Sequence, residues 1–140
     1  MTLRVLVVDD VRENVLLLRT LLERRGIEVD YAYDGESALQ LLNQHRFDVV
    51  LLDIMMPHMD GLQVLDQVRA TPQLATLPII FVTAKTLDAD VLEGYRGGAD
   101  YYITKPFTTQ QVLYGIGLVL GRDLGLDTID TAPAAAKTSR

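Results

Sequence analysis

The sequence predicts an α/β fold in which a parallel, doubly wound sheet of five strands is flanked by five helices. Short runs rich in Val, Ile and Leu, such as residues 3–8 and 47–53, have the composition of strands buried on both faces. Between these runs lie segments whose apolar residues recur at helical spacing. Strands that alternate with helices form parallel sheets, and right-handed crossovers place the helices on both faces.

The first half of the chain is expected to contain three strands separated by two helices. In order, these elements are residues 3–8, from 10 or 11 to 26, 27–33, 36–45 and 47–53. Gly26 is a helix stop signal, and Asp34 with Gly35 is a turn signal after the alternating second strand. The third strand is a nearly continuous apolar run that ends in Asp53.

The second half is expected to contain three helices separated by two strands. In order, these elements are residues 61–70, 78–83, 87–95, 100–104 and 108–120. The first helix stops before Thr71 and Pro72, and Pro78 is tolerated because it is the first residue of its strand. Gly97 and Gly98 end the second helix, and the third reaches Leu120 before the apolar pattern is lost.

The composition excludes several classes of protein. The net charge is −6, and no basic stripe is present to neutralise phosphates, so direct nucleic-acid binding is not expected. The chain contains no cysteine, which excludes disulfides and metal–thiolate sites. The longest apolar stretch, residues 112–120, is too short to span a bilayer. The chain also opens without a signal peptide. We therefore expect a cytoplasmic protein without membrane insertion. We expect one domain over residues 1–121 and a flexible tail or linker over residues 122–140.

The candidate chemistry lies where the expected strands end. Asp9 and Asp10 follow the first strand, Asp53 ends the third, Thr83 the fourth, and Lys105 follows the fifth. The carboxyl ends of parallel strands meet at one edge of the sheet, where α/β proteins place their ligands. Carboxylates there suit a hard cation such as Mg²⁺, and a hydroxyl and an ammonium can hold phosphoryl oxygens. Taken singly, each residue has an ordinary structural explanation: a helix cap or turn for the aspartates, a strand former for Thr83, a surface charge for Lys105.

Four motifs give the chain a resemblance to response regulator receiver domains of two-component signalling, including the chemotaxis-regulator type. The motifs are Val7-Val8-Asp9-Asp10, Leu52-Asp53-Ile54-Met55-Met56-Pro57 with Asp60-Gly61, Val82-Thr83-Ala84 and Tyr102-Ile103-Thr104-Lys105-Pro106-Phe107. They occur in the family's order and at its typical spacing, and the resemblance covers residues 3–120. It implies a flavodoxin-like sheet with the strand order 2-1-3-4-5.

The resemblance also implies a role for each motif residue. Asp53 would be phosphorylated, and Mg²⁺ would be bound by Asp10, Asp53 and the backbone carbonyl of Met55, with Asp9 acting through water. The phosphoryl group would be held by Thr83, Ala84 and Lys105, and the bond before Pro106 would be cis. Thr83 and Tyr102 would form a switch that remodels the face made by the fourth helix, fifth strand and fifth helix. The phosphodonor would be a histidine kinase or a phosphotransfer protein, and the chain would not be a metabolic enzyme.

One feature is particular to this chain: residues 106–121 include no charged residue. Tyr114 and Leu118 would face outward together, and Gly115 and Gly117 would permit close approach of another surface. We expect this face to contact a dimer mate or a downstream protein; otherwise the two side chains are simply isolated exposed residues.

Three further interpretations of the whole chain differ from a phosphoacceptor module that acts alone. A phosphatase of the haloacid dehalogenase type would need a second acid two residues after the nucleophile, where this chain has Met55. A phosphorylation-independent interaction module would use the same fold without the chemistry of Asp53. The chain could also be the N-terminal receiver of a longer hybrid protein.

Overall fold

A computed structural model of the chain describes residues 2–84 and 97–124. The elements in the described residues are β1 (Arg4–Val8), α1 (Arg12–Glu23), β2 (Glu28–Ala32), α2 (Gly35–Gln44), β3 (Val49–Leu52), α3 (Gly61–Ala70), the 3₁₀ helix η1 (Pro72–Leu74), β4 (Ile79–Thr83), β5 (Tyr101–Thr104) and α5 (Thr109–Leu120). The helix expected over residues 87–95 lies outside them. The sequence did not predict η1, a single turn that begins at a proline.

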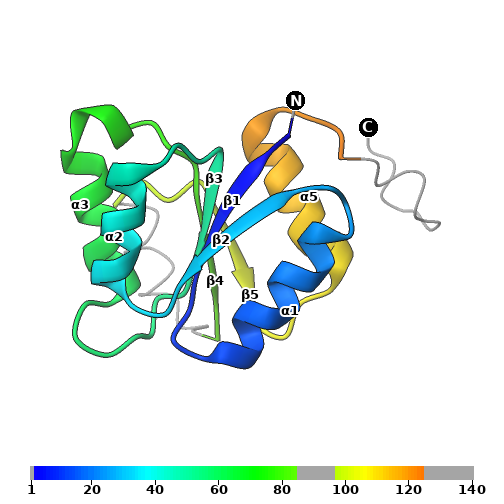
Figure 1. Ribbon diagram of the computed structural model, residues 1–140, viewed down its shortest axis with the longest axis horizontal. Coiled ribbons are helices and arrows are strands. Elements are labelled where there is room, and N and C mark those ends of the chain that lie inside the picture. The colour runs from blue at the N-terminus through cyan, green and yellow to red at the C-terminus, as the bar shows by residue number, and fades with distance from the viewer. Residues whose placement is uncertain (1, 85–96, 125–140) are drawn as a thin grey trace.

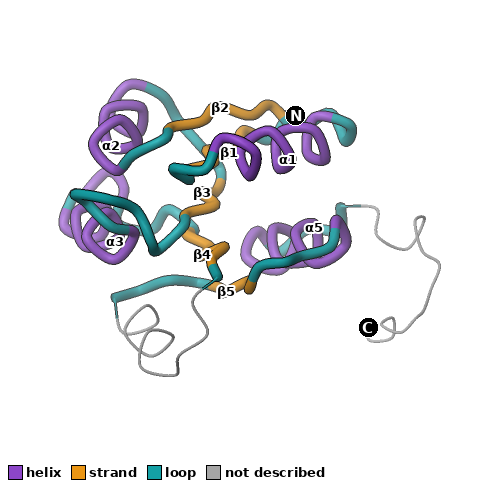
Figure 2. Tube along the Cα trace, turned by 90° about the horizontal axis from the view of Figure 1, so that it is seen from below, coloured by secondary structure: helices purple, strands orange, loops and turns teal. Residues whose placement is uncertain are grey.

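The five strands form one parallel sheet in the order β2-β1-β3-β4-β5, as the resemblance to receiver domains implied. Helices α1 and α5 cover one face of this sheet, and α2 and α3 cover the other (Figures 1 and 2). All strands run in the same direction, so their carboxyl ends share one edge (Figure 1). The fold is therefore the doubly wound, flavodoxin-like α/β architecture.

The sheet separates two apolar cores because successive strand side chains point to opposite faces. The core beneath α1 and α5, here called the α1/α5 core, includes Val5, Val7, Leu18, Leu22, Leu51, Ile80 and Ile116. The core beneath α2 and α3, here called the α2/α3 core, includes Leu6, Val8, Leu52, Val64, Leu65 and Phe81. Every residue of β3 and β4 is buried, which is why both strands read as continuous apolar runs.

Side-chain caps fix where three of the helices begin. Asp34, Asp60 and Thr108 each accept a hydrogen bond from a backbone N–H in the first turn of α2, α3 and α5. Helix α1 begins differently, because its N-cap is Val11, whose side chain makes no capping bond.

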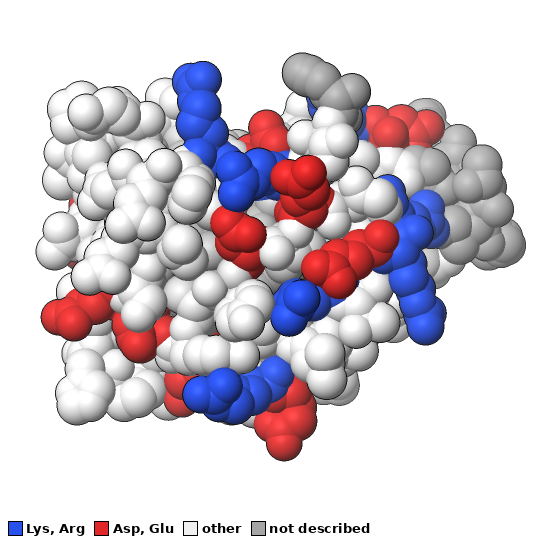
Figure 3. Space-filling model, viewed as in Figure 1, with Lys and Arg blue, Asp and Glu red and all other residues white. Residues whose placement is uncertain are grey.

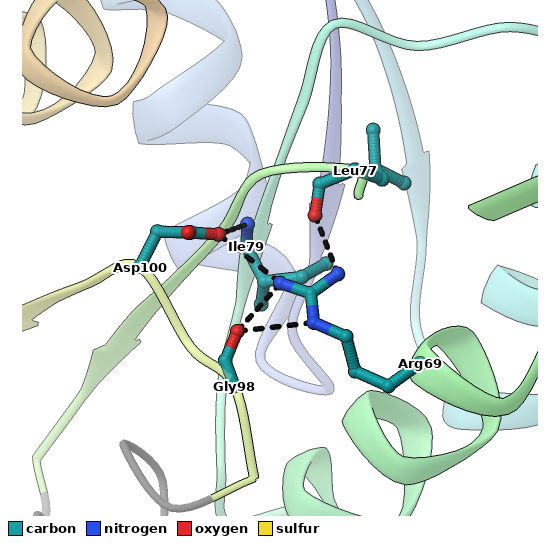
Figure 4. Close-up of polar contacts among 5 residues, drawn as sticks. All are labelled: Arg69, Leu77, Ile79, Gly98 and Asp100. Carbon is teal, nitrogen blue, oxygen red and sulfur yellow. Dashed lines mark hydrogen bonds and ion pairs between the residues drawn. The ribbon is translucent and has the colours of Figure 1, made fainter. Parts of the chain in front are cut away.

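The side chain of Arg69 ties α3 to the amino ends of β4 and β5 (Figure 4). Its guanidinium donates to the carbonyl of Gly98 at 2.6 and 3.1 Å, to the carbonyl of Leu77 at 2.7 Å, and to the Asp100 carboxylate at 3.1 Å. The same carboxylate accepts the backbone N–H of Ile79 at 2.9 Å. These bonds hold the amino end of β5 beside β4. They thereby also help to position the carboxyl end of β5, which lies at the opposite end of the strand.

After α5 the chain turns back onto the domain. Gly121 has a left-handed backbone, and the N–H of Arg122 donates to the carbonyl of Gly117 at 2.9 Å. A Cβ on Gly117 would lie 2.5 Å from the Arg122 carbonyl oxygen. Leu124 packs against the α1/α5 core, and its carbonyl accepts a bond from Arg25 at 3.3 Å. The group that lies close to Gly117 therefore belongs to this chain and not to a partner. The first residues of the expected tail also contact the domain.

No helix within residues 2–84 and 97–124 is long and apolar enough to cross a membrane. On the face shown in Figure 3, acidic and basic side chains are interspersed and do not gather by sign.

Candidate functional site

Three carboxylates meet where β1 and β3 end side by side in the sheet. Asp9 and Asp10 directly follow β1, and Asp53 directly follows β3. One carboxylate oxygen from each residue can be chosen so that all three atoms lie within 4.8 Å of one another. Asp9 and Asp53 are only 2% and 5% exposed, whereas Asp10 is exposed and can meet a ligand from solvent.

Lys105, at the end of β5, joins the two buried carboxylates. Its Nζ lies 2.7 Å from Oδ2 of Asp9 and 3.1 Å from Oδ2 of Asp53. Its peptide bond to Pro106 is cis, as the resemblance to receiver domains implied. With all four groups ionised, one ammonium faces three carboxylates, which leaves the cluster with two negative charges in excess. A cation would relieve this excess.

The pKa of Asp53 is raised above its ordinary value. Burial, which disfavours the charged carboxylate, is the main cause, and the negative charge of Asp9 adds to it. A hydrogen bond from Thr83 and the nearby Lys105 oppose this shift without cancelling it. Burial alone would lower the pKa of Lys105, but its bonds to Asp9 and Asp53 and their charges outweigh burial and raise it. Lys105 is therefore held in its charged form.

Backbone groups fix the carboxylates in place. Oδ1 of Asp9 accepts the N–H of Val11 at 2.9 Å, and Oδ1 of Asp53 accepts the N–H of Met55 at 3.2 Å. A strand-end aspartate can also serve as a turn former, which the sequence left open. Asp9 does so here, because its carboxylate accepts the N–H of the residue two positions later. The Met55 side chain is 55% exposed at the rim of the site.

Gly61 is a site-shaping residue whose role the sequence did not reveal beyond its place in a motif. A Cβ at this position would lie 2.3 Å from the carbonyl oxygen of Asp53 and 2.8 Å from Cα of Ile54. Its N–H donates to the Ile54 carbonyl at 2.9 Å. The absence of a side chain thus lets the start of α3 lie directly against the backbone that carries Asp53.

Two further motif residues lie on β4 and β5, next to the cluster in the sheet. Thr83 ends β4, is fully buried and is hydrogen-bonded to Asp53, and Ala84 follows it on the surface. Tyr102 is half-buried against the α2/α3 core, while its neighbour Tyr101 packs on the opposite face against the α1/α5 core. The structure thus brings Thr83 into the acid cluster and leaves Tyr102 on the flanking strand.

Tyr114 and Leu118 form a separate feature on the outer side of α5. Their exposed fractions are 52% and 53%, as the helical spacing predicted. The Tyr114 ring contacts the Tyr101 ring edge-on, with the centroids 6.5 Å apart. The same Tyr101 ring lies against Gly115. At Gly115, as at Gly117, the group that lies close to the glycine therefore belongs to this chain.

The donor set fits a hard divalent cation. Mg²⁺ prefers one or two carboxylates together with carbonyl oxygens, waters and a phosphate, and it does not need an all-protein cage. The Asp10 carboxylate is exposed, and one oxygen each of Asp9, Asp10 and Asp53 lie close together in one small cluster. The described residues offer no imidazole or thiolate there that would favour a softer metal.

Comparison with known proteins places this geometry in a family. A family model described as the response regulator receiver domain matches residues 5–116. The transcriptional regulatory protein RprY of Bacteroides fragilis is 40% identical over 123 residues, which cover 88% of this chain and 51% of that protein. The regulatory protein VanRc of Enterococcus gallinarum is 38% identical over 122 residues, covering 87% of this chain and 52% of that protein. The chain therefore spans about half the length of these curated relatives.

Solved structures agree with the sequence comparison. The chemotaxis protein CheY4 of Vibrio cholerae has a TM-score of 0.82 and 33% identity, covering 86% of this chain and 100% of that one. A CheY-like response regulator receiver domain protein from Methanospirillum hungatei has a TM-score of 0.80 and 28% identity, covering 86% of this chain and 95% of that one.

Proposed function

Because this chain belongs to the response regulator receiver domain family, we propose that it accepts a phosphoryl group on Asp53 in the presence of Mg²⁺ and then changes a binding surface. The observation that carries the proposal is the cluster itself: two buried carboxylates share one ammonium, and a third, exposed carboxylate lies within 4.8 Å. Such a site has a nucleophile, metal ligands and a phosphate-binding cation in one place.

In the proposed reaction a carboxylate oxygen of Asp53 attacks the phosphorus of the donor. The new O–P bond forms as the donor's P–N or P–O bond breaks, and the leaving atom keeps the electron pair; a leaving nitrogen departs protonated, and a leaving acetate departs as the anion. Nζ of Lys105 lies 3.1 Å from Oδ2 of Asp53. Once the phosphoryl group is attached, this ammonium would bind the phosphoryl oxygens, which then carry the negative charge. Thr83 and the backbone at Ala84 would donate to the same oxygens.

Mg²⁺, when bound, would neutralise charge between the carboxylates and the phosphoryl group. Asp10 and Asp53 would bind it directly together with the carbonyl of Met55, and Asp9 would act through water. Since Lys105 occupies an oxygen of both Asp9 and Asp53 in the resting structure, its shift toward the phosphoryl group would also release these oxygens.

The switch would begin at the phosphoryl oxygens. They would draw Thr83 away from its present bond to Asp53, and Tyr102 on the adjacent strand would turn further into the space that this movement opens. The partner-binding face would then be remodelled by a shift between two packings that differ by a few kcal/mol.

The partners we propose follow from this reaction. A histidine kinase or phosphotransfer protein would donate the phosphoryl group in the cytoplasm, and a downstream protein or a second copy would bind the exposed face of α5 at Tyr114 and Leu118. The chain would act as a signalling module without metabolic turnover and without direct contact to nucleic acid.

Intact-mass spectrometry tests the proposed phosphorylation. The protein is incubated with acetyl phosphate, with Mg²⁺ or with a chelator, and we expect one added phosphoryl group only with Mg²⁺. Asp53→Asn should remain unmodified, while Asp66→Asn, an exposed aspartate on α3, should behave like the wild type. No adduct on the wild type with several small donors would contradict the proposal and favour a phosphorylation-independent interaction module.

Size-exclusion chromatography with beryllofluoride, a phosphoryl mimic, tests the partner face. If the α5 face joins two copies, Tyr114→Glu with Leu118→Lys should abolish any beryllofluoride-dependent dimer. Leu16→Lys with Leu17→Glu, which changes two comparably exposed residues of α1, is the matched control. An unchanged dimer in the α5 variant would exclude this face as the contact between copies.

A further inference from the structure

Arg12, the first residue of α1, is an exposed cation held in a defined place. Its guanidinium carbon lies 4.1 Å from the centroid of the Tyr33 ring, within the range of a strong cation–π contact. The Tyr33 ring is itself half-buried against the α1/α5 core, and it packs on Tyr31 with the centroids 5.3 Å apart. Arg12 therefore rests on an anchored aromatic platform instead of moving freely in solvent.

This platform lies at the edge of the sheet that carries the acid cluster. Helix α1 starts where β1 ends, and Arg12 is only two residues beyond Asp10. Tyr33 directly follows the end of β2, the strand that neighbours β1. In Figure 1 the start of α1 lies at the edge where β1 ends. The two residues thus lie at the same edge of the sheet as Asp53.

The charge of Arg12 is not neutralised by an ion pair among the described residues. Three other arginines, Arg4, Arg19 and Arg69, do form ion pairs there. Contact with an aromatic ring leaves the charge of the guanidinium intact, and N–H donors that face away from the ring remain free for a phosphoryl oxygen. A cation at this end of a helix is disfavoured by the helix dipole, so helix stability does not account for it.

We infer that Arg12, positioned by Tyr33, binds the phosphoryl group of the incoming donor before it reaches Asp53. The inference rests on the proposed phosphorylation of Asp53. With Mg²⁺ bound, the three carboxylates, Lys105 and the metal would carry no net charge, so a fixed guanidinium at this edge of the sheet makes the local potential attractive to a phosphate anion. Arg12 would thereby favour donors with a fully charged phosphoryl group.

Phosphorylation kinetics test this inference. The rate of Asp53 phosphorylation is followed by intact mass at saturating Mg²⁺ and at donor concentrations below saturation. Acetyl phosphate, a dianion near neutral pH, is compared with phosphoramidate, which carries less negative charge. For Arg12→Gln, which keeps helix propensity, we expect a roughly threefold to tenfold lower rate with acetyl phosphate at low ionic strength. The loss should be smaller with phosphoramidate and should shrink at high salt.

Matched variants separate binding from structure. Arg12→Lys keeps the charge and Tyr33→Phe keeps the ring, so both should retain most of the rate, whereas Tyr33→Leu should lower it in the same direction as Arg12→Gln. Dephosphorylation of the purified phosphoprotein and the affinity for Mg²⁺ should not change in Arg12→Gln. A loss that persists at high salt, or that accompanies weaker Mg²⁺ binding, would assign Arg12 a structural role and overturn the inference.

The outcome also distinguishes the two proposals. If the wild type is phosphorylated and Arg12→Gln is phosphorylated at the same rate, only the role of Arg12 fails. If the wild type is not phosphorylated by any donor, the proposed function fails and this inference fails with it.

Discussion

Replacing Asp53 with asparagine should stabilise the metal-free protein at neutral pH. Asparagine has the same shape and keeps one oxygen, which can accept either the N–H of Met55, bound to Oδ1 in the wild type, or the Lys105 ammonium, bound to Oδ2. It removes one of three clustered negative charges, and Asp53 is only 5% exposed, so its charge is poorly solvated.

The size of the effect follows from opposing Coulomb energies. At an effective dielectric constant of about 20, Lys105 at 3.1 Å attracts ionised Asp53 by about 5 kcal/mol. Asp9 and Asp10, each with an oxygen no more than 4.8 Å away, each repel it by at least about 3.5 kcal/mol on the same scale, with the exposed Asp10 screened further by water. The two repulsions together match or exceed the attraction, and the cost of burying the charge adds to them, so removal of the charge should be favourable. From the typical cost of burying a poorly solvated group, we therefore expect Asp53→Asn to raise the free energy of unfolding by about 1–3 kcal/mol.

The gain should depend on pH in a defined direction. Because burial raises the pKa of Asp53 in the folded state, the protonated carboxyl stabilises the fold below the unfolded-state pKa, near 3.8. That stability is lost as the pH rises through the folded-state pKa. The advantage of asparagine should therefore be complete at neutral pH, shrink on acidification, and vanish below about pH 3.8.

Urea unfolding in a chelating buffer measures this difference at several pH values. Asp66→Asn, at an exposed position of α3, is the control and should change stability by less than about 0.5 kcal/mol. An Asp53→Asn protein that is no more stable than the wild type at neutral pH would refute the reasoning. So would an advantage that does not decrease on acidification.

Three further predictions concern the same scaffold. Lys105→Met should destabilise the metal-free protein by about 3–5 kcal/mol in urea unfolding, because it leaves buried carboxylates without their cation, and added Mg²⁺ should restore part of the loss. Gly61→Ala should lower both thermal stability and Asp53 phosphorylation, because its Cβ would lie 2.3 Å from a backbone oxygen; wild-type rates would contradict that geometry. Thr108→Ala should lower the free energy of unfolding by about 1 kcal/mol through loss of the α5 cap, while its neighbour Thr109→Ala should have little effect.

Much of the architecture could be predicted from the sequence because the buried strands carry strong local signals. Every side chain of β3 and β4 is buried, so both strands appear as unbroken apolar runs whose ends mark Asp53 and Thr83. Once parallel strands are inferred, their ends must share an edge, and the meeting of Asp53 with Asp9 and Asp10 follows from topology.

Other features depend on three-dimensional approach and leave no local signal. Gly117 reads as a gap for an outside partner, but the space is filled by the carbonyl of Arg122 after the chain reverses at Gly121. The contact of Lys105 with two carboxylates at once depends on side-chain placement that no spacing rule supplies. The stacking of Arg12 on Tyr33 joins residues that follow two different strands, which only the sheet order brings together.

Chemical mapping of the phosphorylated residue tests the central claim most directly. Sodium borohydride reduces an aspartyl phosphate, but not a free carboxylate, to homoserine, and peptide mass spectrometry then locates the change. After incubation with acetyl phosphate and Mg²⁺, we predict homoserine at position 53 and at no other aspartate of the chain. Homoserine at Asp9 or Asp10, or an unmodified Asp53 in protein that has gained a phosphoryl group, would contradict the account.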